Sequence, residues 1–406
     1  MGGRDPGEAH RVSTTLELLF DLTFVVAISL CGSQLAHAIA SGHAGIGALA
    51  FVFAMFGILW AWMNYTWFAS AFDTDDWAMR IATLVQMVGV LIPGLGQAPF
   101  FTSVQHGQAD NRVLIGGYIV MRLSMIYLWL RVGRESPEYA QKARAYALWI
   151  VIAQSVWVVL GVLDLPLRSA IMGGLVAMMV EIGGLYWVQM HTAGKSTPWH
   201  PHHIAERYGL LVIIALGEVV LGTTTAVAAL VDRTGWSTDA IVVAVAGIAL
   251  AVGVWWCYFA LPWGALLDAN RRLGFRFGYG HMPLYAVIAA IGAGLHVVAY
   301  VIEGESVLTP VGAIIAIAIP VGLAVIGILL FAALVLPAGR SFHLHLSLLV
   351  LSALGLAVAL AALRLPLAWC LGVVVVSPWL AVAAYELRGH EKLNRLLEQS
   401  GVALAD

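Results

Sequence analysis

The chain has 406 residues, of which 61% are hydrophobic and 11% are charged, and its formal net charge is −2. Soluble domains carry about 25% charged residues, so this composition and a mean hydropathy of +0.88 exclude an ordinary soluble protein. A chain so close to neutrality also gives no reason to expect nucleic-acid binding. The three cysteines, at positions 31, 257 and 370, lie in apolar runs and form no disulfide framework or CxxC metal site.

Long apolar runs follow one another along the whole chain with short connections between them. A run of about 20 mostly apolar residues crosses a bilayer as a helix. We therefore predict an all-α polytopic membrane protein with about 12 transmembrane helices and no cleavable signal peptide. The predicted spans are residues 16–39, 46–70, 77–104, 112–131, 143–163, 167–189, 206–231, 237–262, 280–302, 309–336, 342–362 and 366–386.

The basic residues lie mostly on one side of these spans. The side that holds the N-terminus carries most of the Lys and Arg, whereas the opposite side holds only Arg112, Arg168, Arg233 and Arg364. Cytoplasmic loops are enriched in Lys and Arg, so both termini are expected in the cytoplasm. The expected location is the plasma membrane, with the lipid bilayer as the surrounding partner.

Two stretches indicate an internal duplication. ELLFDLTFVVAISL at Glu17 aligns with ERYGLLVIIALGEV at Glu206, and Trp62 and Tyr65 align with Trp255 and Tyr258. Six spans per half predict parallel repeats, with any binding site near their interface. The expected parts are a cytoplasmic segment 1–15, repeats at 16–190 and 206–386, a cytoplasmic linker 191–205 and a cytoplasmic tail 387–406.

The first predicted span carries two carboxylates on one face, Glu17 and Asp21, which are four residues apart. Glu17 is close enough to the helix end to be solvated. Asp21 is one turn deeper, where a charge costs roughly 2.5–3.5 kcal/mol or more, so we expect it to have a partner or a wet cavity. Gln34 and His37 lie on another side of the same helix, which favours a central position for it.

The segment around the second and third spans combines aromatic residues, carboxylates and prolines. Trp60, Trp62, Tyr65 and Trp67 are typical of an interfacial aromatic belt, and Asn64 among them is expected to reach another helix. Asp73, Asp75 and Asp76 are placed at the cytoplasmic surface, with Asp75 or Asp76 as a helix N-cap and Asp76 with Arg80 as an i, i+4 pair. Pro93, Gly94 and Gly96 predict either a non-helical break or a proline kink.

Three further charges lie deep in predicted spans. Arg122 is the basic residue expected deepest in the membrane, and we predict that it pairs with Glu218 or Asp21. Glu181 has no cation near it in the sequence. Glu218 and Arg207 share a helix face about 16 Å apart, too far to bind each other, so Glu218 needs a partner on another helix.

A histidine cluster precedes the seventh predicted span and includes His200, His202, His203 and Glu206. Such a group can supply metal ligands, but no second motif with ligand spacing accompanies it. We expect surface histidines here, and neither a metal nor a cofactor.

The motifs quoted above, together with WAWMNYTWFASAFDTDDWAMR, YIVMRLSMIYLWLR and HHIAERYGLLVIIALGEVVLG, resemble those of the bacterial low-temperature-requirement A family over nearly the whole chain. The resemblance implies a membrane protein class but no substrate. It covers the following positions: Glu17, Phe20, Asp21, Asn64, Tyr65, Asp73, Asp76, Arg80, Arg122, His203, Glu206, Arg207 and Glu218.

These charges lead to three functional hypotheses. The first is a transporter or channel-like permease for a small solute or ion, with a homodimer as the candidate assembly and enzymatic activity as the less favoured interpretation. Its pathway would be lined by intramembrane polar residues: Asp21, Gln34, His37, Asn64, Tyr65, Arg122, Glu181 and Glu218. The cytoplasmic-face cluster would comprise Glu17, Asp73, Asp76, Arg80, His203, Glu206 and Arg207. The alternatives are a membrane-embedded enzyme acting on a lipid-like substrate through His203, Glu206 and Arg207, and a structural or sensory protein.

Overall fold

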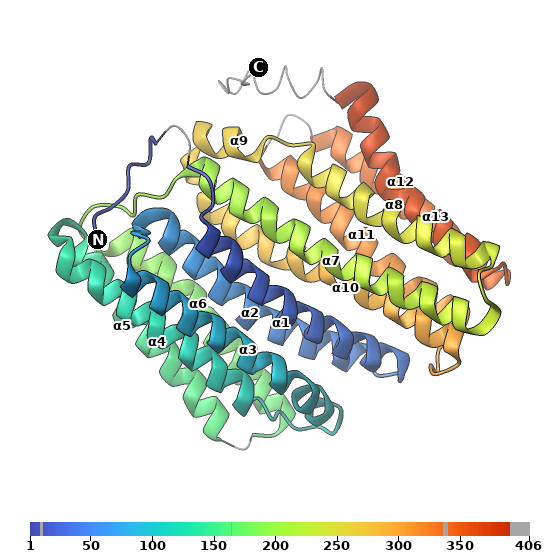
Figure 1. The fold of residues 1–406 in the computed structure, drawn as a ribbon, viewed down its shortest axis with the longest axis horizontal. Helices are drawn as coiled ribbons and strands as arrows, with labels where there is room; N and C mark the ends of the chain where they lie inside the picture. The colour runs from blue at the N-terminus through green and yellow to red at the C-terminus, as the bar shows by residue number, and fades with distance from the viewer. Residues whose placement is uncertain (9–10, 164, 336–339, 390–406) are drawn as a thin grey trace. The chain divides into compact units, whose positions relative to one another are not determined.

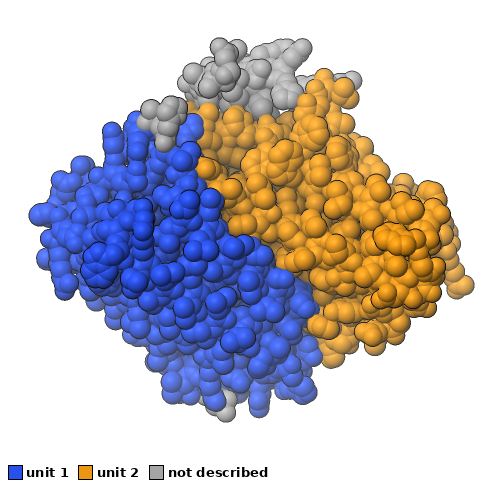
Figure 2. Space-filling model, viewed as in Figure 1, with its two compact units in different colours: residues 1–34, 46–204 blue, residues 35–45, 205–406 orange. Residues whose placement is uncertain are grey.

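A computed structural model describes residues 1–8, 11–163, 165–335 and 340–389 (Figure 1). Over these residues the protein is all-helical, and twelve helices are long and apolar enough to cross a membrane. The predicted fold class and number of spans are therefore confirmed. The chain divides into two compact units, shown in Figure 2: unit 1 holds residues 1–34 and 46–204, and unit 2 holds residues 35–45 and the chain from Ala205 onward.

The long helices follow the predicted spans closely. The first six are α1 (Thr15–Ala40), α2 (Ala44–Phe72), α3 (Trp77–Gln105), α4 (Arg112–Glu135), α5 (Ala140–Val162) and α6 (Leu167–His191). They are followed by α7 (Pro201–Thr234), α8 (Thr238–Phe259), the short α9 (Trp263–Ala269), α10 (Gly274–Glu303), α11 (Pro310–Val335), α12 (Arg340–Ala362) and α13 (Leu367–Ala384). Single turns are η1 (Pro137–Tyr139), η2 (Arg271–Leu273) and η4 (Tyr385–Gly389).

In unit 1, consecutive helices pack on one another from α3 to α6, and α6 returns to α2, where Gly174 faces the ring of Phe53. The backbones of α3 and α4 approach each other closely. A Cβ atom on Gly117 would lie 2.2 Å from Cδ of Pro93 and 2.7 Å from the carbonyl oxygen of Gly89. Only glycine therefore fits at position 117.

In unit 2 the packing follows the same order. Helix α10 packs on α11, α11 on α12 and α12 on α13, and α13 returns to α8, where Gly253 faces Pro378. The aligned tyrosines also make corresponding contacts: the Tyr65 hydroxyl lies 2.9 Å from the Thr83 hydroxyl of α3, and the Tyr258 hydroxyl lies 2.8 Å from Nε2 of His281 on α10. This likeness favours the duplication, which stays a prediction.

The structure excludes one of the two alternatives for α3 and moves one predicted boundary. Helix α3 continues through Pro93 and Pro99, so no non-helical break occurs between them. The carbonyl of Gly89, which loses its helical partner because Pro93 has no N–H, lies against the backbone of Gly117 on α4. Helix α7 starts at Pro201, so residues 201–205 of the predicted linker 191–205 are helical; proline is favoured in the first helical turn. Most of the predicted tail 387–406 lies outside the described residues.

Candidate functional site

A hydrogen-bonded polar group within the spans surrounds Glu181 of α6. Its carboxylate accepts hydrogen bonds from Nη2 of Arg122 at 2.6 Å, from Nε1 of Trp60 at 2.7 Å and from the Tyr118 hydroxyl at 2.7 Å. Nε of Arg122 donates to the Tyr118 oxygen at 3.0 Å, and the guanidinium lies 4.9 Å from the centre of the Tyr118 ring. All four side chains are buried, and they come from three helices, α2, α4 and α6.

This arrangement corrects one prediction. The carboxylate paired with Arg122 is Glu181, neither Glu218 nor Asp21, and the cation beside Glu181 comes from a helix that is distant in sequence. The pair forms because α6 places Glu181 next to α4, although the two residues are 59 positions apart. Tyr118 was missed by the sequence reasoning, yet its position one helical turn before Arg122 was a usable signal.

The two carboxylates of α1 are both buried, with 1% of each side chain exposed. Asp21 accepts a hydrogen bond from Nε1 of Trp62 at 2.7 Å, so the expected partner exists and is an indole. The prediction that Glu17 is solvated at the helix end is wrong. Its Oε2 accepts from the Thr14 backbone N–H at 2.9 Å and lies 3.2 Å from Nε2 of His203. Thr14 and Glu17 thus form a capping box that starts α1.

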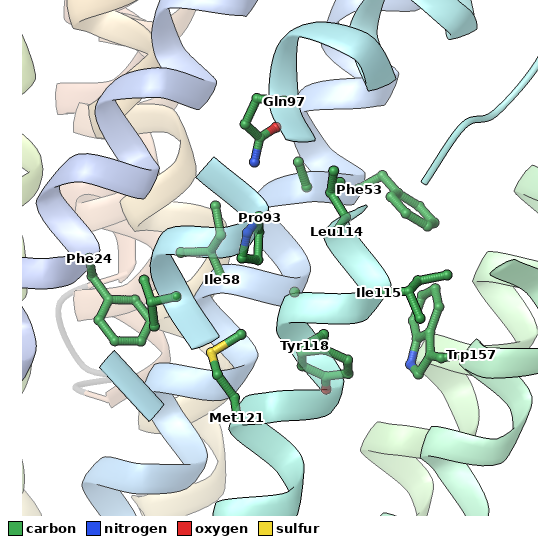
Figure 3. Close-up of a pocket in the computed structure, with 13 residues that line it drawn as sticks. Phe24, Phe53, Ile58, Pro93, Gln97, Leu114, Ile115, Tyr118, Met121 and Trp157 are labelled. Carbon is green, nitrogen blue, oxygen red and sulfur yellow. The ribbon is translucent and has the colours of Figure 1, made fainter. Parts of the chain in front are cut away.

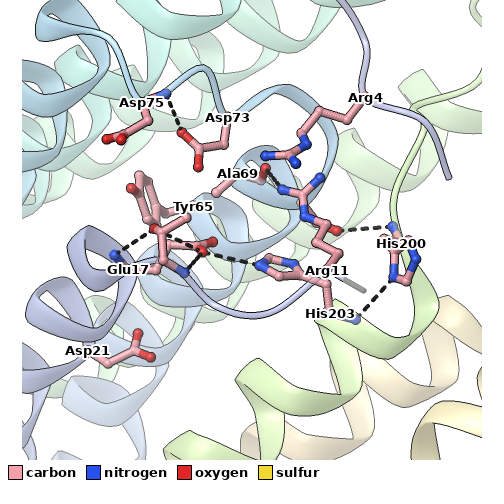
Figure 4. Close-up of polar contacts among 12 residues, drawn as sticks. Arg4, Arg11, Glu17, Asp21, Tyr65, Ala69, Asp73, Asp75, His200 and His203 are labelled. Carbon is pink, nitrogen blue, oxygen red and sulfur yellow. Dashed lines mark hydrogen bonds and ion pairs between the residues drawn. The ribbon is translucent and has the colours of Figure 1, made fainter. Parts of the chain in front are cut away.

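Figure 4 shows the polar side chains around this capping box. Arg11 donates to the Ala69 carbonyl at 2.7 Å, and burial, followed by the nearby charge of Arg4, lowers its pKa to about 10. Nε2 of His200 donates to the Glu8 carbonyl, so Nδ1 is left to accept from the His203 backbone N–H at 3.3 Å. His200 and His203 are buried, whereas His202 and Glu206 are exposed. The prediction of surface histidines is therefore wrong for His200 and His203.

The loop before α3 divides its three aspartates between different environments. Asp76 is the N-cap, because its Oδ1 accepts from the Met79 N–H at 2.9 Å, which confirms that prediction. Arg80, however, pairs with Asp75 at 2.9 Å, and Asp76 pairs with Arg131 of α4. Asp73 is buried rather than at the surface. Burial raises the pKa of Asp73, whereas the hydrogen bond from Arg131 lowers the pKa of Asp76.

The aromatic residues of α2 do not form an interfacial belt. Trp60, Trp62 and Tyr65 are at most 1% exposed, and their polar atoms bind Glu181, Asp21 and Thr83. Asn64 donates to the Trp60 carbonyl of its own helix at 2.7 Å and does not reach another helix through this contact. An indole or phenol that binds an internal carboxylate gives the same sequence pattern as one that faces lipid headgroups.

The other predicted site residues lie in unit 2, except Gln34. Glu218 and Arg207 are buried, at 2% and 0% exposure, on α7. Gln34, which ends the first segment of unit 1, is half-buried. His37 of unit 2 is exposed, with Nε2 3.1 Å from the Tyr300 hydroxyl. His281 is fully buried: its Nδ1 donates to the Phe277 carbonyl, so its Nε2 accepts the proton of the Tyr258 hydroxyl.

Unit 1 also contains a cavity of about 40 Å³, shown in Figure 3. Its walls come from α1 to α5 and include Tyr118 of the Glu181 network. Sequence reasoning missed Gln97 and Trp157, which line it; a glutamine within an apolar span was the available signal for the first. Among the residues that the structure describes, no group of three or more His, Cys, Asp or Glu side chains is placed to hold a metal ion.

Comparison with known proteins gives a family but no activity. No solved structure matches the chain. An uncharacterized protein of Rhizobium meliloti (strain 1021) is 26% identical over 293 residues, which cover 68% of this chain and 67% of that protein. The model of the bacterial low temperature requirement A protein (LtrA) family matches residues 12–378. With nearly its whole length matched and twelve helices able to span a membrane, the chain belongs to the LtrA family of multi-pass membrane proteins.

Proposed function

We propose that this protein is a transporter or channel-like permease that moves a small solute or ion across the membrane. The observation that carries the proposal is the Arg122–Glu181 pair, kept within helices that span the membrane and bonded to Tyr118 and Trp60. Ionisable residues inside spans are costly and by default mark substrate or ion pathways. Asp21 of unit 1 and Glu218 of unit 2 are two further buried carboxylates within spans, and we propose that each serves transport in its own unit.

A purely structural role is the main competitor, because buried pairs also fasten helices. Replacing a buried ion pair by apolar residues of similar volume is often neutral or stabilising, so stability alone is a weak reason to keep one. That argument favours a functional reason for Arg122 and Glu181. The enzymatic alternative at His203, Glu206 and Arg207 stays a prediction that the described contacts do not favour.

Flux into liposomes tests the proposal. The purified protein is reconstituted, and gradients of H⁺, Na⁺ and K⁺ are imposed one at a time while ion-sensitive dyes inside report their decay. We expect the wild-type protein to dissipate at least one gradient, and Asp21→Asn and Glu218→Gln to slow that flux at least tenfold. Glu303→Gln, an exposed carboxylate at the end of α10, is the matched control and should retain it. Absence of flux for all three gradients contradicts transport of these ions, and normal flux in both variants contradicts the role proposed for Asp21 and Glu218.

A second pair of variants separates transport from helix fastening. Arg122→Met alone leaves a buried carboxylate unpaired and is expected to cost about 3–5 kcal/mol, so loss of flux there is uninformative. Arg122→Met combined with Glu181→Met removes both charges. If the double variant elutes as a folded protein and has lost flux, the charges act in transport; if it retains flux, the pair serves only to hold α4 and α6 together.

A further inference from the structure

The cavity of unit 1 is lined by a side-chain amide, that of Gln97, whose hydrogen-bonding atoms have no partner among the described residues. Gln97 of α3 lines it and is 1% exposed, and neither its amide nitrogen nor its amide oxygen has a hydrogen-bond partner among the described residues. In Figure 3 the amide nitrogen is directed toward Pro93 and the interior of the cavity. Buried amide groups are nearly always satisfied, by protein atoms or by a molecule that fills the space beside them.

A second unsatisfied donor belongs to the same wall. Trp157 of α5 lines the cavity, is 5% exposed, and its Nε1 has no partner within the described part of the chain. By contrast, the Tyr118 hydroxyl is fully engaged with Glu181 and Arg122. The cavity therefore offers two donors and one acceptor that other residues do not use.

The rest of the wall limits what can enter. Apolar groups dominate it, among them Phe24, Ile58 and Met121, and no ionised side chain lines it. An ion would lose its hydration without gaining a counter-charge, so charged ligands are excluded. One water molecule needs about 10–15 Å³, so a cavity of about 40 Å³ accepts roughly three waters or a solute of a few heavy atoms.

The amide of Gln97 also sets the chemistry of the ligand. A carboxamide presents a donor and an acceptor side by side in one plane, and its best complement offers an acceptor and a donor in the same arrangement. Another carboxamide or a urea group has this edge. An alcohol, a ketone or an alkane satisfies fewer of the three free atoms.

We propose that this cavity is a binding site for a small uncharged solute that bears a carboxamide or urea group. The carbonyl oxygen of the ligand accepts from Nε2 of Gln97, an N–H of the ligand donates to Oε1, and the apolar remainder packs on Phe24, Pro93 and Met121. Binding at this site does not depend on the transport function proposed above, and each can fail without the other.

Ligand-observed saturation-transfer NMR on the full-length protein in detergent tests the proposal, with acetamide as the probe. Acetone keeps the acceptor but lacks the N–H donor, and acetate and acetamidinium are charged compounds of the same size. We expect clear transfer to acetamide, an affinity for acetone at least fivefold weaker, and no transfer to either charged compound.

Two variants alter the site by independent routes. Gln97→Leu removes both amide atoms at nearly constant volume. Gly57→Val fills the space, because Gly57 lines the cavity and a Cβ added there meets no atom within 4 Å. Gly116→Val is the matched control: Gly116 also faces open space and is similarly half-exposed, but it does not line the cavity.

We expect both cavity variants to weaken acetamide binding at least tenfold while eluting as folded protein, and Gly116→Val to bind as the wild type does. Absence of transfer to acetamide in the wild type would mean that the cavity holds water alone and would overturn the proposal. Equal binding by a folded Gln97→Leu variant, or equal binding of acetate, would overturn it as well. If one cavity variant does not fold, the other decides.

Discussion

Asp73 and Asp76, three residues apart in one loop, carry the same chemical group in opposite environments. Asp76 caps α3 and binds Arg131, and that hydrogen bond lowers its pKa. Asp73 is buried with 7% of its side chain exposed, and burial raises its pKa, although its Oδ1 accepts from the Asp75 N–H at 3.0 Å. The two carboxylates therefore contribute to the pH dependence of stability with opposite signs.

We predict that Asp76→Asn destabilises the protein at pH 7 by less than about 1 kcal/mol, because asparagine keeps the cap and loses only a partly exposed ion pair. A lowered folded-state pKa means that the contribution of Asp76 is complete above its unfolded value of 3.8 and is lost as the pH falls through the folded value. Thermal unfolding at pH 7, 5 and 3 measures this. A gap between wild type and variant that is equal at pH 7 and 5 and smaller at pH 3 is expected; a gap that widens on acidification contradicts the assignment.

Asp73→Asn should act in the other direction. The ionised carboxylate is unfavourable in the folded state, so the neutral amide should raise the unfolding temperature at pH 7. This gain should shrink as the pH falls toward the raised pKa of Asp73, where the wild-type group takes up a proton. Unfolding curves of wild type, Asp73→Asn and Asp76→Asn in the same buffers provide the comparison, and a variant less stable than wild type at pH 7 would show that the charged form is needed.

Charges deep inside apolar runs could be predicted to be buried, whereas their partners could not, and Glu17 and Asp73 at the ends of such runs were wrongly predicted to be at the surface. A charge inside an apolar run stands out by its type, which is how Asp21, Arg122, Glu181 and Glu218 were found. Arg122 and Glu181 meet because α4, α5 and α6 pack in sequence, and no local pattern encodes which turns face each other. The cap at Asp76 was predictable because a cap involves residues two or three positions away.

At the scale of a helix, the close contact of α3 with α4 is possible because glycine, which has no side chain, lies at the points where the two backbones meet. Gly89, Pro93 and Gly117 bring the two backbones together, and the proline for which a break or a kink was predicted fits against a glycine of the neighbouring helix. Proline and glycine in membrane helices are tolerated where a neighbouring helix covers the affected backbone. The hydropathy pattern located both helices correctly but could not show this fit, which depends on the register between them.

Two adjacent glycines of α4 offer a matched test of this contact. Gly117→Ala would place a methyl group within 2.2 Å of Pro93 and is expected to destabilise the protein by about 1–3 kcal/mol. Gly116→Ala meets nothing within 4 Å and should change stability by no more than about 0.5 kcal/mol. Denaturant or thermal unfolding in one detergent compares them. Equal effects of the two substitutions would mean that α3 and α4 are not in close contact at Gly117.

At the scale of the molecule, the number of spans was the most predictable property, since a helix must be about 20 apolar residues long to cross the bilayer. Twelve is an even number, so both ends of the chain are expected on one side, and the distribution of basic residues predicts that this side is cytoplasmic. The division into units was less predictable: residues 35–45 belong with the second half of the chain, although they are far from it in sequence.

Cysteine labelling tests the orientation, because the three native cysteines are buried and so are shielded from the reagent. Gln108→Cys lies in the exposed connection of α3 to α4 and should react with a membrane-impermeant maleimide in intact cells. Lys195→Cys, exposed in the connection of α6 to α7, should react only after the cells are opened. The reverse pattern would place both termini outside the cytoplasm.

The separation of Arg122 from Glu181 also sets an order of events during synthesis. The ribosome releases α4 before α6, and 59 residues separate the arginine from its carboxylate. At a synthesis rate of about 5–20 residues per second, Glu181 is made roughly 3–12 s after Arg122. During that time a nascent α4 carries an uncompensated cation, which the translocon or an insertion chaperone must keep out of lipid. If the ribosome is stalled between α4 and α6, we accordingly expect α4 to be incompletely inserted into the membrane. In the Arg122→Leu variant, α4 should be fully inserted at the same stalling point.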